Sequence, residues 1–174
     1  MSMEDDIFNK VDTHYTAIYG WQDYFGKEYF SFGYIDSYKS AADLLIDQHA
    51  PDLFIFPVMF SYRQYLELVL KNICYRNMDE SKYVKFIKMR SHNLQAIWRD
   101  SKMFLKEYIS GEELEVIERA VSFFYRIDPN SFNFRFESDK KNNKSIKENL
   151  RINMKELRKW MNKVDEILRF TYDE

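Results

Sequence analysis

Residues 57–74 read PVMFSYRQYLELVLKNIC, and this stretch decides the fold class. Its apolar side chains recur at i, i+3 and i+4, which is the period of an α-helix. Pro57 suits the first turn of a helix, because a proline there gives up no internal hydrogen bond. The remaining faces are also rich in apolar residues, and a helix that is apolar nearly all round belongs in the middle of a bundle. The stretch therefore predicts a long central helix that begins at Pro57.

Three charged residues, Arg63, Glu67 and Lys71, lie four positions apart on this helix and share one stripe. On a solvated face, such alternating pairs add only about 0.2–0.5 kcal/mol each. On a central helix the same charges need partners, because a buried unpaired charge is costly. Candidate partners stand further along the chain, at Asp128, Arg135 and Asp139. The stripe is thus either a solvated face or a partly buried polar cluster.

Helical spacing also predicts a helix over about residues 37–49, which Pro51 and Asp52 then end. The charged residues 77–91 are expected to form a loop with one helical turn at most. Further helices are predicted after Ser91, which can cap the helix that follows it, and after Ser110, which with Glu113 makes a capping box.

Asp128, Pro129 and Asn130 predict a turn that ends the helix after Ser110. Residues 131–136 alternate apolar and polar side chains, which predicts a short extended segment or a single strand. Residues 137–149 are expected to form a loop, and Asn153 is expected to cap the last helix. The apolar seam of that helix either packs in the core or joins two subunits, and core packing is favoured; its members are Met154, Leu157, Met161, Val164 and Leu168.

These elements predict an all-α bundle of about five helices in one domain, residues 1–174. The chain is 45% hydrophobic and 18% aromatic, which is enough to fill a core. The aromatic residues 1–35 are expected to pack as an extension on the bundle of residues 36–174. An RNA-stacking platform is the alternative role for those rings, because bases stack on aromatic side chains.

Charge and cysteine content narrow the functional classes. The formal net charge of −2 creates no strong field toward nucleic acid or membrane, although residues 135–174 hold eleven basic and eight acidic side chains. Such an excess is either an inert basic end or a face for an anionic partner. Cys74 is the single cysteine, so no internal disulfide forms and a reducing, cytoplasmic setting is expected. The pattern indicates no membrane span, no cofactor motif and no metal-spaced Cys/His set.

His92 stands at a predicted helix start, where free backbone N–H groups attract anions. If Arg63 lies close to it, the pair can hold a phosphate, because a guanidinium binds phosphate with two parallel hydrogen bonds. A histidine can also move protons near neutral pH. A structural role is the plain alternative for each of the three histidines, His14, His49 and His92.

Three blocks of sequence together resemble a group of uncharacterised bacterial proteins similar to the HEPN superfamily of small helical bundles. The blocks are Pro57 to Lys71, His92 to Trp98, and Asp128 to Phe136 with Asp139. The resemblance implies a homodimer that binds RNA, a nucleotide or a protein partner in phage defence or a toxin–antitoxin pair. It also implies a polar ligand pocket made of Arg63, Glu67, Lys71, His92, Asp128, Ser131, Arg135 and Asp139.

The sequence departs from the ribonucleases of that superfamily, which carry an arginine four to six residues before a histidine. Here the arginine nearest before His92 is Arg90, two positions away. Three hypotheses follow. The chain is a non-catalytic binding or regulatory member, or Arg63 and His92 form a metal-independent ribonuclease site from separate helices. The third is a protein-interaction module that meets its partner through the last helix and residues 131–136.

Overall fold

The computed structural model describes residue 17 and residues 27–146 and 150–172. The chain forms two compact units, Met1–Phe30 and Ser31–Glu174, and the bundle belongs to the second. The predicted packing of the aromatic residues 1–35 falls almost wholly outside the described residues. The described helices are, in chain order, α2 (Lys27–Ile46), α3 (Pro51–Asn77), α4 (Glu80–Arg90), α5 (Leu94–Leu105), α6 (Gly111–Ile127), α7 (Met154–Leu168) and the short 3-10 helix η2 (Arg169–Thr171).

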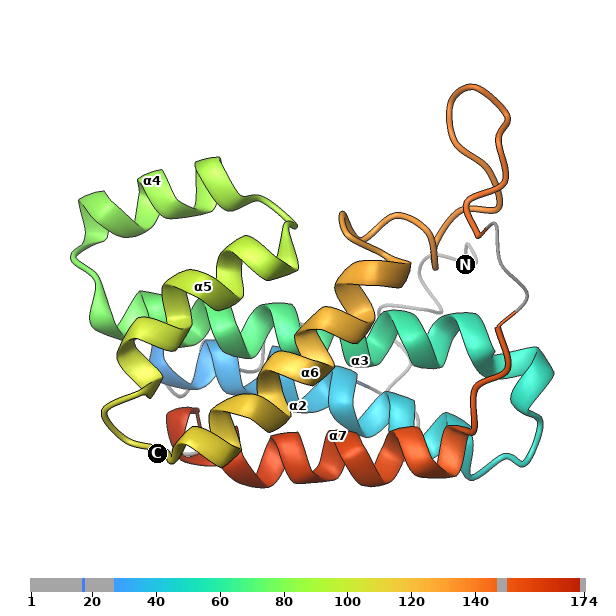
Figure 1. Ribbon diagram of the computed structural model, residues 1–174, viewed down its shortest axis with the longest axis horizontal. Coiled ribbons are helices and arrows are strands. Elements are labelled where there is room, and N and C mark those ends of the chain that lie inside the picture. Colours follow the sequence, from blue (N-terminus) through green and yellow to red (C-terminus); the bar gives the residue numbers. More distant parts are fainter. Residues whose placement is uncertain (1–16, 18–26, 147–149, 173–174) are drawn as a thin grey trace, which may run out of the picture. The chain divides into compact units, whose positions relative to one another are not determined.

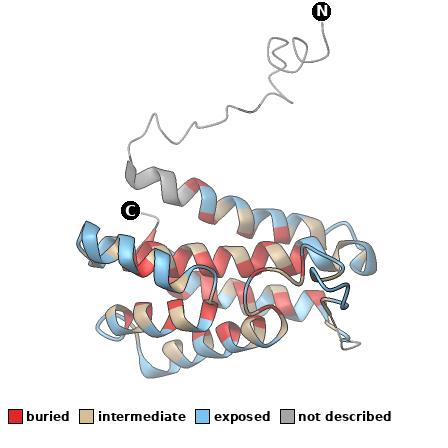
Figure 2. Ribbon diagram, turned by 90° about the horizontal axis from the view of Figure 1, so that it is seen from above, coloured by how far each residue is buried: buried red, intermediate tan, exposed pale blue. Residues whose placement is uncertain are grey.

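Helix α3 is the centre of the bundle, as its nearly continuous apolar surface predicts. It contacts α4, α5, α7 and η2, while α6 packs on α5 and α7. Figure 1 shows α3 running the length of the bundle, with α7 beside it. In Figure 2 the buried residues follow α3 and the inward faces of its neighbours. The predicted all-α bundle is therefore confirmed for the described part of the chain, with six α-helices where about five were expected.

The start of α3 differs from the prediction, because the helix begins at Pro51 and continues through Pro57. Pro51 takes the first-turn position that the sequence suggested for Pro57. Inside the helix, Pro57 removes one backbone hydrogen bond, the bond to the carbonyl of Leu53. Leu53 is 71% exposed, so that carbonyl can be hydrated instead. The backbone hydrogen bond that Pro57 removes is therefore one at the exposed start of α3.

Most of residues 77–91 lies in helix α4 (Glu80–Arg90), so the expectation of a loop with one helical turn at most was wrong. The side chain of Asp79 caps α4 by accepting a hydrogen bond from the backbone N–H of Lys82 at 2.9 Å. The helix is anchored to α3 by rings, because Tyr83 meets Tyr75 of α3 edge to face with ring centres 5.1 Å apart, and Phe86 is buried. Ser91 does not cap the next helix. It ends α4 with a positive φ of 47°, and Asn93 caps α5 by accepting from the N–H of Ala96.

No strand is present in the described residues, so residues 131–136 do not form the expected extended segment. The chain turns there, with the N–H groups of Arg135 and Phe136 both donating to the carbonyl of Phe132. An isolated bridge between Ser138 and Lys144 closes the loop that follows. Of the three alternating phenyl rings only Phe134 is buried, while Phe132 is partly buried and Phe136 is 50% exposed, so the period-two pattern marks no buried face.

Several local predictions are confirmed. Ser110 and Glu113 form the capping box of α6, and Asp128 ends that helix. Asn153 caps α7 by accepting from the N–H groups of Lys155 and Glu156. The apolar seam of α7 is buried inside the chain, so it packs in the core as favoured. Cys74 is buried as well, and burial raises the pKa of its thiol to about 12, which leaves it unreactive near neutral pH.

By length and composition, α3 is apolar enough to cross a membrane, and no other helix in the described residues is. Of its most apolar window, 56% is buried inside the protein. The core helix of a soluble protein meets the same criteria, so this property is weak evidence about membranes.

Candidate functional site

The side chain of Arg63, in the middle of α3, is fully enclosed. Its Nε donates to the backbone carbonyl of Asp128 at 2.8 Å, and Nη1 donates to Oε2 of Glu67 at 2.9 Å. Its Nη2 donates to the carbonyl of His92 at 2.7 Å and less closely to that of Pro129 at 3.4 Å. Arg63 thus ties α3 to the turn before α5 and to the end of α6. With its donors engaged and no exposed surface, it does not face a ligand.

Glu67 is the shared acceptor of the site and is 1% exposed. Its Oε1 accepts from Nζ of Lys71 at 2.6 Å and lies 2.8 Å from Nδ1 of His92. Burial alone would raise the pKa of Glu67, but the charges and hydrogen bonds of Lys71 and Arg63 outweigh burial and hold the pKa below its usual value. Glu67 is therefore an ionised carboxylate that joins three basic side chains.

His92 is oriented by this carboxylate. An ionised carboxylate only accepts, so the 2.8 Å contact assigns the proton to Nδ1 of His92 and leaves Nε2 to act as a base or, once protonated, as a donor. The side chain of His92 is 51% exposed, and that of Lys71 is 15% exposed. Within the described residues no hydrogen bond engages Nε2. At the rim of the cluster, the carboxylate of Glu67 therefore holds both the imidazole of His92, with Nε2 unengaged, and the ammonium group of Lys71.

Asp128 completes the cluster from the end of α6. Its Oδ1 accepts from the N–H groups of Phe132 at 2.6 Å and Asn133 at 3.0 Å, which holds the loop that contains the buried Ser131. Its Oδ2 lies 3.6 Å from Nε of Arg63 and has no hydrogen bond. The carboxylates of Glu67 and Asp128 together balance the buried charge of Arg63.

The structure brings together most, but not all, of the predicted site residues. Arg135 is exposed, and its Nε donates to the carbonyl of Ser131 at 2.6 Å. Asp139 accepts from the N–H groups of Lys141 and Asn143 within its own loop. Neither contacts the Arg63 guanidinium, although both were candidate partners. The side chains that meet are those of Arg63, Glu67, Lys71, His92 and Asp128, with Ser131 in the adjoining loop.

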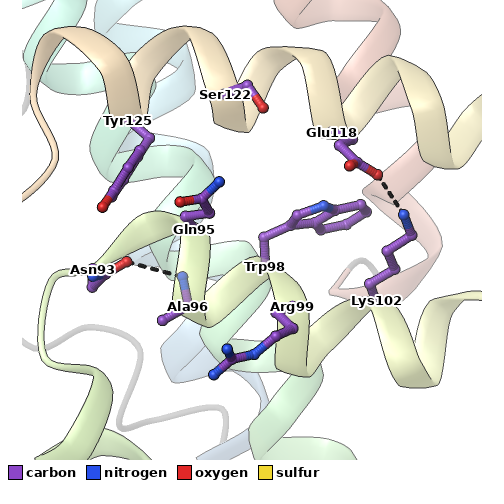
Figure 3. Close-up of a pocket in the computed structure, with 9 residues that line it drawn as sticks. All are labelled: Asn93, Gln95, Ala96, Trp98, Arg99, Lys102, Glu118, Ser122 and Tyr125. Atoms are coloured by element: carbon purple, nitrogen blue, oxygen red, sulfur yellow. Dashed lines mark hydrogen bonds and ion pairs between the residues drawn. The ribbon is translucent and has the colours of Figure 1, made fainter.

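A groove of about 510 Å³ lies between α5 and α6, and residue 93, which follows His92, is part of its wall. Figure 3 shows Tyr125 extending from α6 toward α5 near Gln95, and Lys102 paired with Glu118 at the other end. Arg99 also lines the groove, with a side chain that is 67% exposed. No sequence motif marks these residues, although positions 95, 99 and 102 lie on one stripe of α5.

Comparisons of the chain with family models, with curated proteins and with solved structures gave no match. The HEPN resemblance thus rests on the sequence pattern. In the described residues, no three His, Cys, Asp or Glu side chains come together as metal ligands. The chemistry that the site offers is anion contact by His92 and Lys71, and proton transfer by the imidazole of His92.

Replacing Arg63 tests its structural role. We expect Arg63→Ala to lower the free energy of unfolding by about 3–5 kcal/mol, because it leaves buried Asp128 without its ion-pair partner and removes one of the partners of buried Glu67. Arg76→Ala, at an exposed position of the same helix, should change it by about 0.5 kcal/mol or less. Urea unfolding followed by circular dichroism measures both. Equal stability of Arg63→Ala and the parent would contradict the role.

The lowered pKa of Glu67 predicts an acid-dependent loss of stability. Its contribution is present above the unfolded value of 4.5 and is lost as pH falls through the lower folded pKa, because the unfolded chain then binds more protons. Glu67→Gln should therefore be less stable than the parent at neutral pH, and the gap should narrow below that value. Urea unfolding at several pH values checks this, and a gap that stays constant would refute it.

Proposed function

We propose that this chain is a HEPN-like domain that binds RNA or a nucleotide, with a regulatory role in a bacterial defence or toxin–antitoxin system. The sequence resemblance is the basis for proposing a HEPN-like domain, a homodimer, and a role in a defence or toxin–antitoxin system. The observation that supports such a ligand is the half-exposed imidazole of His92. Its Nδ1 lies 2.8 Å from Oε1 of buried Glu67, which also binds Lys71. A fixed imidazole with a neighbouring ammonium suits a phosphate, because charge-assisted hydrogen bonds are the stronger ones.

The buried charges favour ligand contact by His92 and Lys71 over ligand contact by Arg63. Glu67 and Asp128 already balance Arg63, so an incoming anion would meet Lys71 and His92 at the rim and not the enclosed guanidinium. The groove between α5 and α6 continues from residue 93 and adds the exposed cation of Arg99 and the ring of Tyr125. Phosphate contacts and base stacking can therefore follow one path across the domain.

Binding of a fluorescein-labelled single-stranded RNA, with ATP as competitor, tests the proposal. We expect His92→Asn and Lys71→Ala each to raise the Kd roughly tenfold or more, the effect of one lost charge-assisted hydrogen bond of about 1.5–3 kcal/mol. Fluorescence anisotropy at fixed low salt gives the Kd, and urea unfolding confirms that each variant is folded.

The matched controls are His49→Asn and Lys85→Ala, which replace an exposed histidine and an exposed lysine outside the cluster. Asparagine is chosen because His49 has a positive φ of 54°, which asparagine tolerates. The controls should bind like the parent. If the parent binds neither RNA nor ATP, or if the His92 and Lys71 variants match it, the proposal fails.

The hydrogen bond between Glu67 and His92 favours one alternative, a metal-independent endoribonuclease. Nε2 of His92 would take the proton of a ribose 2′-hydroxyl as its oxygen attacks the adjacent phosphorus. The bond from phosphorus to the 5′-oxygen would break, that oxygen would take a proton from solvent water, and the new end would be a 2′,3′-cyclic phosphate. Lys71 would steady the phosphate in place of Arg63.

Incubating the protein with single-stranded RNA and a chelator tests this alternative. Cleavage should leave cyclic-phosphate ends, and His92→Asn should slow it by ~10²–10⁴-fold, the usual contribution of a general acid or base. Mass spectrometry of the fragments identifies the ends. An intact substrate, or cleavage at the parent rate by His92→Asn, rules out the ribonuclease.

A further inference from the structure

A second cavity lies beside the first turns of α3, away from the Arg63 guanidinium. Its volume is about 590 Å³, within the range of small-molecule sites. Phe56 of α3 and Phe136 of the loop after α6 line it, and each is 50% exposed. Phe134 and Ile146 contribute further apolar surface. Two half-exposed phenyl rings at one cavity are an apolar surface that needs a reason.

Arg135 stands at this cavity in a fixed orientation. Its Nε donates to the carbonyl of Ser131 at 2.6 Å, and its guanidinium carbon lies 5.4 Å from the ring centre of Phe136 and 5.8 Å from that of Phe60. Within the described residues, Nη1 and Nη2 of Arg135 have no hydrogen bond or ion pair. The two rings and the carbonyl thus hold a planar cation whose outer donors remain available.

Further polar side chains line the cavity. Lys144 adds a second cation and Glu137 one carboxylate, so the charged lining has an excess of one positive charge. Ser145 also lines it, and its Oγ is buried with no hydrogen-bond partner. The cavity therefore suits a flat aromatic group that carries an anion.

We propose that this cavity binds a nucleobase bearing a phosphate, with the base against Phe56 and Phe136 and the phosphate on Arg135 and Lys144. The choice of a nucleotide among aromatic anions rests on the proposed function. The inference adds a second subsite to that function, and it gives Arg135 a role apart from the Arg63 cluster. The ligand is either a free nucleotide or one residue of an RNA strand, because both present the same base and phosphate.

A fluorescent base tests the subsite. 2-Aminopurine riboside 5′-monophosphate loses fluorescence on stacking, so titration with the full chain gives a Kd. We expect Phe136→Leu and Arg135→Gln each to raise this Kd at least roughly tenfold, as the loss of a stacked base or a phosphate contact does. The controls are Phe170→Leu and Arg126→Gln, which replace a 43% exposed phenyl ring and an exposed arginine outside the cavity.

Two further probes identify the ligand. The nucleoside without its phosphate should bind roughly tenfold more weakly, because Arg135 loses its partner. Quenching of a single-stranded RNA that carries one 2-aminopurine would assign the subsite to RNA, and quenching of the monophosphate alone would assign it to a free nucleotide. Equal binding of the nucleoside and its monophosphate would overturn the role of Arg135.

His92→Asn separates this inference from the proposed function. We expect that variant to quench the monophosphate like the parent while it binds labelled RNA more weakly. A contrary result is that His92→Asn abolishes quenching of the monophosphate while the Phe136 and Arg135 variants keep it. The nucleotide would then bind at His92. In that case the second subsite is wrong and the proposed function stands. If the parent binds labelled RNA but quenches neither 2-aminopurine probe, the subsite alone fails. If the parent binds no probe at all, both fail.

Discussion

The buried charge of Arg63 is the constraint on which the middle of this bundle depends. A guanidinium with no exposed surface must be neutralised and hydrogen-bonded, because desolvating an unpaired ion costs several kcal/mol. Glu67 and Asp128 supply the negative charge, and carbonyls from two connecting segments take the remaining donors. One side chain on α3 thereby determines where the turn before α5 and the end of α6 lie.

The same network orients the candidate ligand-binding groups. Glu67 gives one oxygen to Arg63 and the other to Lys71 and His92, so the carboxylate that stabilises the core also holds the imidazole at the surface. An imidazole fixed in this way loses little conformational freedom when it meets a phosphate. Stability and ligand contact are consequently linked through one buried residue. Substitutions at Glu67 will change both properties, whereas His92 and Lys71 report on the ligand more directly.

Arg63 and Arg135 have different environments, which suit the first to a structural role and the second to ligand recognition. Arg63 is enclosed, and backbone carbonyls and a carboxylate occupy its donors. Arg135 is held through Nε and two phenyl rings, with its outer donors directed to no described residue. A guanidinium that is oriented but not saturated is suited to recognition, because its planar fork is already in place. The resemblance grouped the two arginines in one pocket; in the structure Arg63 is enclosed and Arg135 lines a cavity.

The sequence by itself determined the features that depend on near neighbours. The capping box at Ser110, the cap at Asn153, the seam of α7 and the central position of α3 all follow from spacings within a few turns of helix. It misjudged α4, whose short charged sequence is held by packing on other elements, and residues 131–136, where an alternating pattern hides a series of turns. Only the tertiary structure decided that His92 and Asp128 meet Arg63 while Arg135 and Asp139 do not. His92 and Asp128 lie 29 and 65 positions from Arg63 along the chain. Whether such distant residues meet depends on how whole helices pack, and the spacing of residues in the sequence does not determine that packing.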